Sequence, residues 1–168
     1  DSNLNSITDL KNSKVGIKEY SQTAAVWLRG ILLEEYDLHW SSIYWYANKT
    51  QRFIPPAEAN VRLIGGDPEE LVINGTLDAY VAPRPLDIQK SPKDRVLRPL
   101  INDYLEVEKK YFKTSGIYPI NHCVMIHNDI LTKNPEIGYS VFKAYSKSKE
   151  KALKRKLGAT LLPWVDRQ

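Results

Sequence analysis

Residues 14–33, KVGIKEYSQTAAVWLRGILL, combine a short apolar run, a polar turn and a helical pattern. The apolar positions after the turn recur at three- and four-residue spacing, which predicts one helical face made of Ala24, Trp27, Leu28, Ile31 and Leu32. Ser21 or Thr23 is expected to cap the first N–H groups of this helix. Such a turn directs backbone donors and the positive end of a helix dipole into a crevice, where carboxylates and phosphates bind. The alternative is an ordinary strand-to-helix connection without a ligand.

The first half of the chain alternates between strand-like and helix-like patterns. Strands are expected at residues 15–18, 43–46, 61–64 and 77–82, and helices at residues 7–11, 23–36 and 67–74. Asp67 is expected to cap the last of these helices, with Pro68 at its first position. This order predicts an α/β fold with a mostly parallel sheet, flanking helices and right-handed crossovers.

The second half has fewer clear elements. Residues 87–100 are expected to be irregular, and a helix is expected at 103–114 with Gly116 at its end. Residues 118–127, YPINHCVMIH, have a β-like composition, and residues 134–157 have the pattern of the longest helix. The apolar tail LLPW at residues 161–164 is expected to be covered by other parts of the protein.

Composition places the chain among globular proteins. It has 168 residues, 42% of them hydrophobic and 26% charged, which suits one domain or one domain with part of another. No run approaches the roughly 20 apolar residues of a membrane-spanning helix, so no membrane span is expected. The N-terminus lacks a signal-peptide pattern, but this has little weight because the sequence does not begin with Met.

Several residue types argue against particular partners and cofactors. Seven basic residues and one acid lie between positions 143 and 156, where a solvated helix face is favoured over contact with nucleic acid. The single cysteine, Cys123, excludes an intramolecular disulfide and a multi-thiolate metal site. The three histidines, His39, His122 and His127, have no ligand spacing with carboxylates. We therefore expect no metal site and no cofactor.

Five ordered segments resemble one known family. VGIKEYSQTAAVWLRGIL, residues 15–32, resembles the signature VGVPEYxxTAxxWxRGxL of 4,5-dihydroxyphthalate decarboxylase-like proteins. The other segments are ITDLKNSKVG, LVINGTLDAYVAPRP, YFKTSGIYPINHCVMIHNDILTKNPEI and FKAYSKSKEKAL. Two features depart from the pattern: Lys18 replaces a proline, and the loop at residues 47–60 is short. These proteins are similar in fold to type 2 periplasmic solute-binding proteins.

The resemblance implies a central fragment of a two-lobed protein. Residues 1–117 would form a ligand-binding second lobe, and residues 118–168 a crossover strand and long helix that return to the first lobe. The missing N- and C-terminal segments of the parent chain would complete that lobe. Without them, we expect residues 118–157 to self-associate or to be disordered, because an unpaired strand edge pairs readily with another chain.

The resemblance also implies a site for a small aromatic or dicarboxylic acid between the lobes. The predicted substrate-binding residues are Tyr20, Gln22, Thr23, Trp27, Arg29 and Arg84, and the predicted catalytic residues are His122 and Glu19. Arg84, between two prolines at a strand end, would grip a carboxylate. Core packing is favoured over ligand contact for Trp27, and Arg29 lies off the apolar face, as an exposed residue would. Glu19 would act as base and His122 as acid, or the reverse.

Two functions remain open at this stage. The first is decarboxylation of a substrate of the 4,5-dihydroxyphthalate type, which implies a cytoplasmic enzyme. The second is ligand binding without chemistry, as in the periplasmic or extracellular receptor of an ABC transporter. Fold alone does not separate them, because one fold serves many functions.

Overall fold

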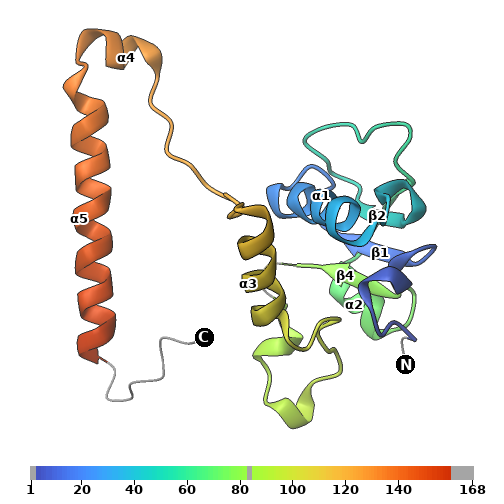
Figure 1. Ribbon diagram of the computed structural model, residues 1–168. Helices are drawn as coiled ribbons and strands as arrows, with labels where there is room; N and C mark the ends of the chain where they lie inside the picture. Colours follow the sequence, from blue (N-terminus) through green and yellow to red (C-terminus); the bar gives the residue numbers. More distant parts are fainter. Residues whose placement is uncertain (1–2, 83–84, 160–168) are drawn as a thin grey trace. The chain divides into compact units, whose positions relative to one another are not determined.

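The computed structural model describes residues 3–82 and 85–159, and it divides the chain into two compact units, Asp1–Asn121 and His122–Gln168 (Figure 1). The strands are β1 (Lys14–Ile17), β2 (Tyr44–Asn48), β3 (Val61–Ile64) and β4 (Ala79–Val81). The α-helices are α1 (Thr23–Tyr36), α2 (Pro68–Ile73), α3 (Tyr104–Ser115), α4 (Asn128–Lys133) and α5 (Glu136–Ala159). Short 3-10 helices are η1 (Ile7–Leu10), η2 (Trp40–Ser42), η3 (Asp87–Gln89) and η4 (Pro92–Asp94).

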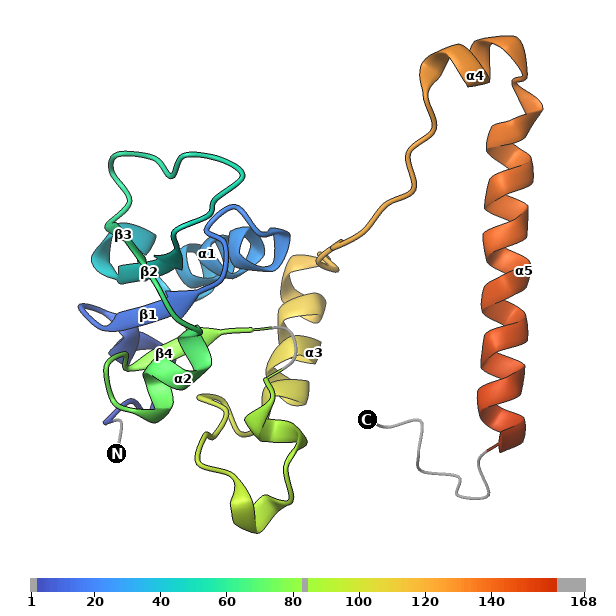
Figure 2. The same ribbon diagram turned by 180° about the vertical axis from the view of Figure 1, so that it is seen from behind.

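The first unit is built on a four-stranded parallel sheet with the order β3-β2-β1-β4 (Figure 2). The central strand β1 pairs with β2 on one side and with β4 on the other; Val15, for example, lies opposite Trp45 and Ala79. The α/β prediction with a mostly parallel sheet and flanking helices is therefore confirmed. The assignment of residues 1–117 and 118–168 to two lobes of a type 2 binding fold stays a prediction.

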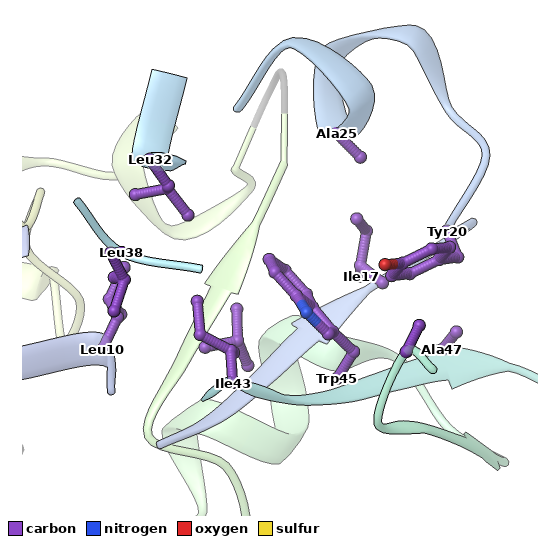
Figure 3. Close-up of a cluster of buried hydrophobic side chains, with 11 residues drawn as sticks. Leu10, Ile17, Tyr20, Ala25, Leu32, Leu38, Ile43, Trp45 and Ala47 are labelled. Atoms are coloured by element: carbon purple, nitrogen blue, oxygen red, sulfur yellow. The ribbon is translucent and has the colours of Figure 1, made fainter. Parts of the chain in front are cut away.

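The two faces of β1 pack against different helices. Val15 and Ile17 are buried in a cluster that includes Ala25 and Leu32 of α1 (Figure 3). Gly16 points to the opposite face, because successive residues of a strand alternate. A Cβ atom at Gly16 would lie 2.9 Å from the Pro68 Cβ of α2. Helices α1 and α2 therefore cover opposite faces of the sheet, as Figure 1 shows.

The start of α2 has the predicted capping arrangement. The Asp67 side chain accepts a hydrogen bond from the Glu69 backbone N–H at 2.8 Å, and Pro68 occupies the first turn. Proline suits this position because its missing N–H would have no partner within the helix. The predicted end of α3 is also confirmed, since Gly116 adopts a left-handed conformation with φ of 68°.

The prediction of a strand at residues 118–127 is wrong. The whole segment is described, and it contains no strand and pairs with none. A β-like composition is not sufficient for a strand, because its backbone N–H and C=O groups need a neighbouring strand as partner. The next element is α4, whose first turn is capped by His127, with Nδ1 accepting from the Asp129 N–H at 3.3 Å.

In the second unit, α5 is the long helix that the sequence predicts, but it begins at Glu136 instead of residue 134. Tyr139, Phe142 and Tyr145 are exposed on it, at 60–69% of their full surface. The self-association expected for residues 118–157 stays a prediction. Residues 161–164 lie outside the described residues. None of the described helices has the length and apolar character needed to cross a membrane.

Candidate ligand-binding site at the carboxyl ends of β1 and β4

The sheet order creates a topological switch point between β1 and β4. The chain leaves β1 towards α1 on one face of the sheet, whereas α2 on the other face leads into β4. In open parallel sheets, ligands bind outside the carboxyl ends of the strands at such a point. The polar turn at residues 18–22 lies at this edge because it follows β1 directly. Arg84 follows β4 in sequence but lies outside the described residues.

Glu19 forms an ion pair in this turn. Its Oε1 atom accepts hydrogen bonds from the Arg52 Nε at 2.7 Å and from the Ser21 hydroxyl at 2.8 Å. The Arg52 guanidinium, together with the Ser21 hydroxyl, holds the pKa of the Glu19 carboxyl below its ordinary value. Glu19 is therefore ionised at neutral pH, and its affinity for a proton is reduced.

Tyr20 belongs to the hydrophobic core. Its side chain is 5% exposed, and its ring meets Trp45 edge to face at a centroid distance of 6.0 Å (Figure 3). Burial raises the pKa of the Tyr20 phenol, against the opposing charge of Arg29. The buried ring leaves little surface for stacking with a ligand, and the predicted ligand role of Tyr20 stays untested.

Arg29 fastens the turn to the first helix. Its guanidinium carbon lies 3.8 Å from the centroid of the Tyr20 ring, and its Nη1 donates a hydrogen bond to the Tyr20 carbonyl at 2.8 Å. Burial lowers the pKa of this half-buried guanidinium. Its offset from the apolar face suggests an exposed side chain, but the structure places Arg29 over Tyr20. Arg29 is therefore a positioning residue for the turn in this structure.

Gln51 ties the loop after β2 to the same turn. Its Oε1 accepts a hydrogen bond from the Tyr20 N–H at 2.8 Å, and its Nε2 donates to the carbonyls of Asn48 at 2.8 Å and Lys18 at 3.1 Å. Neither Gln51 nor Arg52 is among the residues that the sequence predicts for the site. No local pattern marks them, because their partners in the turn, Tyr20 and Lys18 for Gln51 and Glu19 for Arg52, lie more than thirty positions away along the chain.

The first turn of α1 is not capped as expected. Gln22 is the N-cap residue and its side chain makes no capping hydrogen bond, while the Ser21 hydroxyl donates to Glu19. The expectation that Ser21 or Thr23 caps this helix is therefore wrong, and Thr23 is exposed at the first helical position. A helix N-terminus without a side-chain cap keeps donors for an anionic group.

The two remaining predicted residues, Trp27 and His122, lie outside the polar turn. Trp27 is half-buried, and its Nε1 donates to the Ile120 carbonyl at 3.0 Å; the choice between core packing and ligand contact for Trp27 stays a prediction. His122 is exposed and is the first residue of the second unit. The structure thus brings Glu19, Tyr20 and Arg29 together in one turn, and the catalytic role of His122 stays a prediction.

A pocket of about 120 Å³ opens on the α2 side of the same sheet edge. Its lining residues are Lys18, Asp67, Pro68, Glu69, Tyr80, Val81, Ala82 and Leu86. The two Glu69 oxygens accept hydrogen bonds from the N–H groups of Leu86 at 2.9 Å and Asp87 at 2.5 Å. These bonds hold the chain after β4 against the start of α2.

Asp87 extends this network into the following loop. It is fully buried and accepts hydrogen bonds from the Lys90 ammonium and from the N–H groups of Val96 and Leu97, all at 2.7–2.9 Å. Lys90 and these backbone donors hold the pKa of the Asp87 carboxyl below its ordinary value. Within the described residues, no group of three or more His, Cys, Asp or Glu side chains is arranged to hold a metal ion.

A parallel sheet with helices on both faces defines an open-sheet α/β protein, the class in which ligands bind at the carboxyl edge of the sheet. No protein-family model matches the chain. A 4,5-dihydroxyphthalate decarboxylase from Comamonas testosteroni is 27% identical over 165 residues, which cover 92% of this chain and 50% of that protein. A second one, from Pseudomonas putida, is 30% identical over 95 residues, which cover 50% of this chain and 36% of that protein.

These matches confirm the resemblance found in the sequence: the chain is a distant homologue of 4,5-dihydroxyphthalate decarboxylase. It spans about half the length of the Comamonas relative.

Proposed function

We propose that this chain forms part of a carboxy-lyase that removes CO₂ from a hydroxylated aromatic dicarboxylate of the 4,5-dihydroxyphthalate type. The observation that carries the proposal is the homology to a decarboxylase over 92% of the chain. The open edge beside β1 and β4 supports it, because polar turn residues gather where parallel sheets bind ligands.

The spectator carboxylate of the substrate would bind at the first turn of α1. Helix α1 has 14 residues and no side-chain cap at its start, so the backbone N–H groups of its first turn, beginning at Thr23, suit a carboxylate. Arg84 would hold the same group through two parallel hydrogen bonds. Because Arg29 and Gln51 fasten the turn, these donors are held in place before the ligand arrives.

The reaction replaces a carboxylate by a proton on the aromatic ring. In 4,5-dihydroxyphthalate, one hydroxyl is para to each carboxylate, so deprotonation of that hydroxyl directs electron density to the carbon that carries the leaving group. An acid protonates this carbon, the carbon–carboxylate bond breaks, and CO₂ departs as the phenolate electrons return to the oxygen. Glu19 would accept the phenol proton and His122 would protonate the ring, or the reverse.

One observation favours a second candidate, which is carboxylate binding without chemistry. Glu19 is paired with Arg52 at 2.7 Å, and its lowered pKa makes it a weak base. A base role would require the Arg52 guanidinium to move away when the substrate binds. If the pair persists in the complex, the same turn would serve binding alone.

Release of CO₂ from 4,5-dihydroxyphthalate tests the first candidate, and calorimetry with the same compound tests binding. We expect Glu19→Gln and His122→Ala to lower kcat by at least tenfold with a smaller effect on affinity, because both groups would move protons in the transition state. Arg84→Ala should abolish the binding heat, whereas the control Arg62→Ala, at an exposed strand position, should leave it unchanged. Binding without CO₂ release would decide for the second candidate, and absence of both would refute the proposal.

A further inference from the structure

We infer that the pocket between β1, β4 and α2 recognises a hydroxyl group of the ligand, with Tyr80 and Lys18 as specificity-determining residues. This inference rests on the proposed function, since it assigns a hydroxyl-binding subsite to the same ligand. The predicted site residues do not include either side chain. The inference is carried by the volume of the pocket, by the state of the Tyr80 hydroxyl and by the charges around it.

The pocket has a suitable size and position for one edge of a ring. Its volume is about 120 Å³, and an apolar cavity of roughly 150 Å³ admits a whole benzene molecule. Lys18 lines the pocket and is also the first residue of the polar turn that leads to the start of α1, where the carboxylate would bind. We expect the carboxylate of the ligand at the start of α1 and its hydroxyl in this pocket.

The Tyr80 hydroxyl is a buried polar group with unused hydrogen-bonding capacity. Its oxygen is shielded from solvent and has no hydrogen-bond partner of normal geometry among the described residues, and the Glu69 carboxylate is its nearby acceptor. Burial, with the nearby Glu69 carboxylate, raises the pKa of the Tyr80 phenol, so the group stays protonated at neutral pH. A protonated phenol donates one hydrogen bond and accepts others, which matches a ligand hydroxyl that does the same.

The charges in the pocket favour a neutral ligand group. The Lys18 ammonium lies 3.9 Å from the Asp67 carboxylate, and both Glu69 oxygens are already bonded to backbone N–H groups. Two carboxylates and one ammonium would repel a second carboxylate or a phosphate, while Lys18 would repel an amine. A hydroxyl avoids both penalties. The 3.9 Å separation is too long for a hydrogen bond, so Lys18 keeps donors for the ligand oxygen.

Calorimetry with two probes, 4,5-dihydroxyphthalate and unsubstituted phthalate, tests the subsite. We expect the chain to bind the hydroxylated compound more tightly. Tyr80→Phe should weaken binding of 4,5-dihydroxyphthalate by about two- to tenfold, as for one neutral hydrogen bond, and should leave phthalate unchanged. Lys18→Gln should reduce the same preference, and because Lys18 is largely exposed this variant does not threaten folding. The control Tyr44→Phe removes an exposed hydroxyl from a strand and should change neither affinity.

The outcomes separate this inference from the proposed function. Equal binding of both probes by the unmodified chain would refute the hydroxyl subsite and leave the carboxylate site standing. An equal loss of both probes in Tyr80→Phe would show a structural role, and no change in either variant would show that the pocket holds only water; both results overturn the inference. If neither probe binds, the proposed function itself fails.

Discussion

Replacing Gly16 by alanine should destabilise the first unit, because this position has no room for a side chain. An added Cβ would lie 2.8 Å from the Leu77 Cδ1, 2.9 Å from the Pro68 Cβ and 3.3 Å from the Tyr80 Cβ. Pro68 is rigid and the Leu77 side chain is 2% exposed, so neither can move aside without a cost in free energy. Overpacking of this kind costs about 1–3 kcal/mol. Alanine also reduces the conformational entropy of the unfolded chain, which offsets about 0.4–1 kcal/mol of this cost.

We therefore expect Gly16→Ala to lower the free energy of unfolding by roughly 1–2 kcal/mol, or the Tm by about 2–8 °C. Urea unfolding followed by tryptophan fluorescence is a suitable assay, because Trp27, Trp40 and Trp45 all lie in the first unit. Gly30→Ala is the matched control. Its Cβ would meet no described atom within 4 Å, and in the middle of α1 it should stabilise by about 0.5–1 kcal/mol. A Gly16→Ala chain as stable as the unmodified one would refute the packing argument.

Arg29→Met should cost about 1–2 kcal/mol in urea unfolding, because it removes both the stacking on Tyr20 and the bond to its carbonyl; an unchanged midpoint would contradict this. Arg52→Gln should raise the pKa of the Glu19 carboxyl towards its ordinary value in an NMR titration, since the guanidinium is the main cause of the lowered pKa. The ion pair stabilises the folded chain above the unfolded-state pKa of Glu19, and this stabilisation disappears as the pH falls through the lower folded-state pKa. The free energy of unfolding of Arg52→Gln should therefore fall less than that of the unmodified chain when the pH is lowered. Asp87→Asn should accelerate hydrogen exchange of the two backbone N–H groups that the carboxylate accepts, and unchanged exchange would show that the charge is unnecessary there.

Local patterns were sufficient for most elements of the first unit. The apolar spacing and the flanking polar residues predict α1 at residues 23–36, which is where it lies. The Asp67-Pro68 pair marks the start of α2 for the same reason, because capping depends only on neighbouring residues. The alternation of strand and helix patterns also predicts the parallel sheet. A helix or loop after each strand brings the chain back to the same edge of the sheet, so the next strand runs in the same direction.

The failures share a different cause. Residues 118–127 have the composition of a strand, but a strand also needs a partner, which composition does not supply. Ser21 has the right type and place for a cap, but its hydroxyl donates to Glu19. The first error arises from a missing pairing partner, and the second from a competing contact that outweighs the local preference.

The sequence by itself determined the helix and strand pattern, the polar turn after β1 and the likeness to a decarboxylase. Only the tertiary structure decided which side chains meet at that turn. The strand order places β4 beside β1, and the loop after β2 returns Gln51 and Arg52 to the turn. The pocket lined by Lys18 and Tyr80 arises in the same way. These contacts join residues more than thirty positions apart, and such pairs are created by the pairing of strands and not by any local spacing.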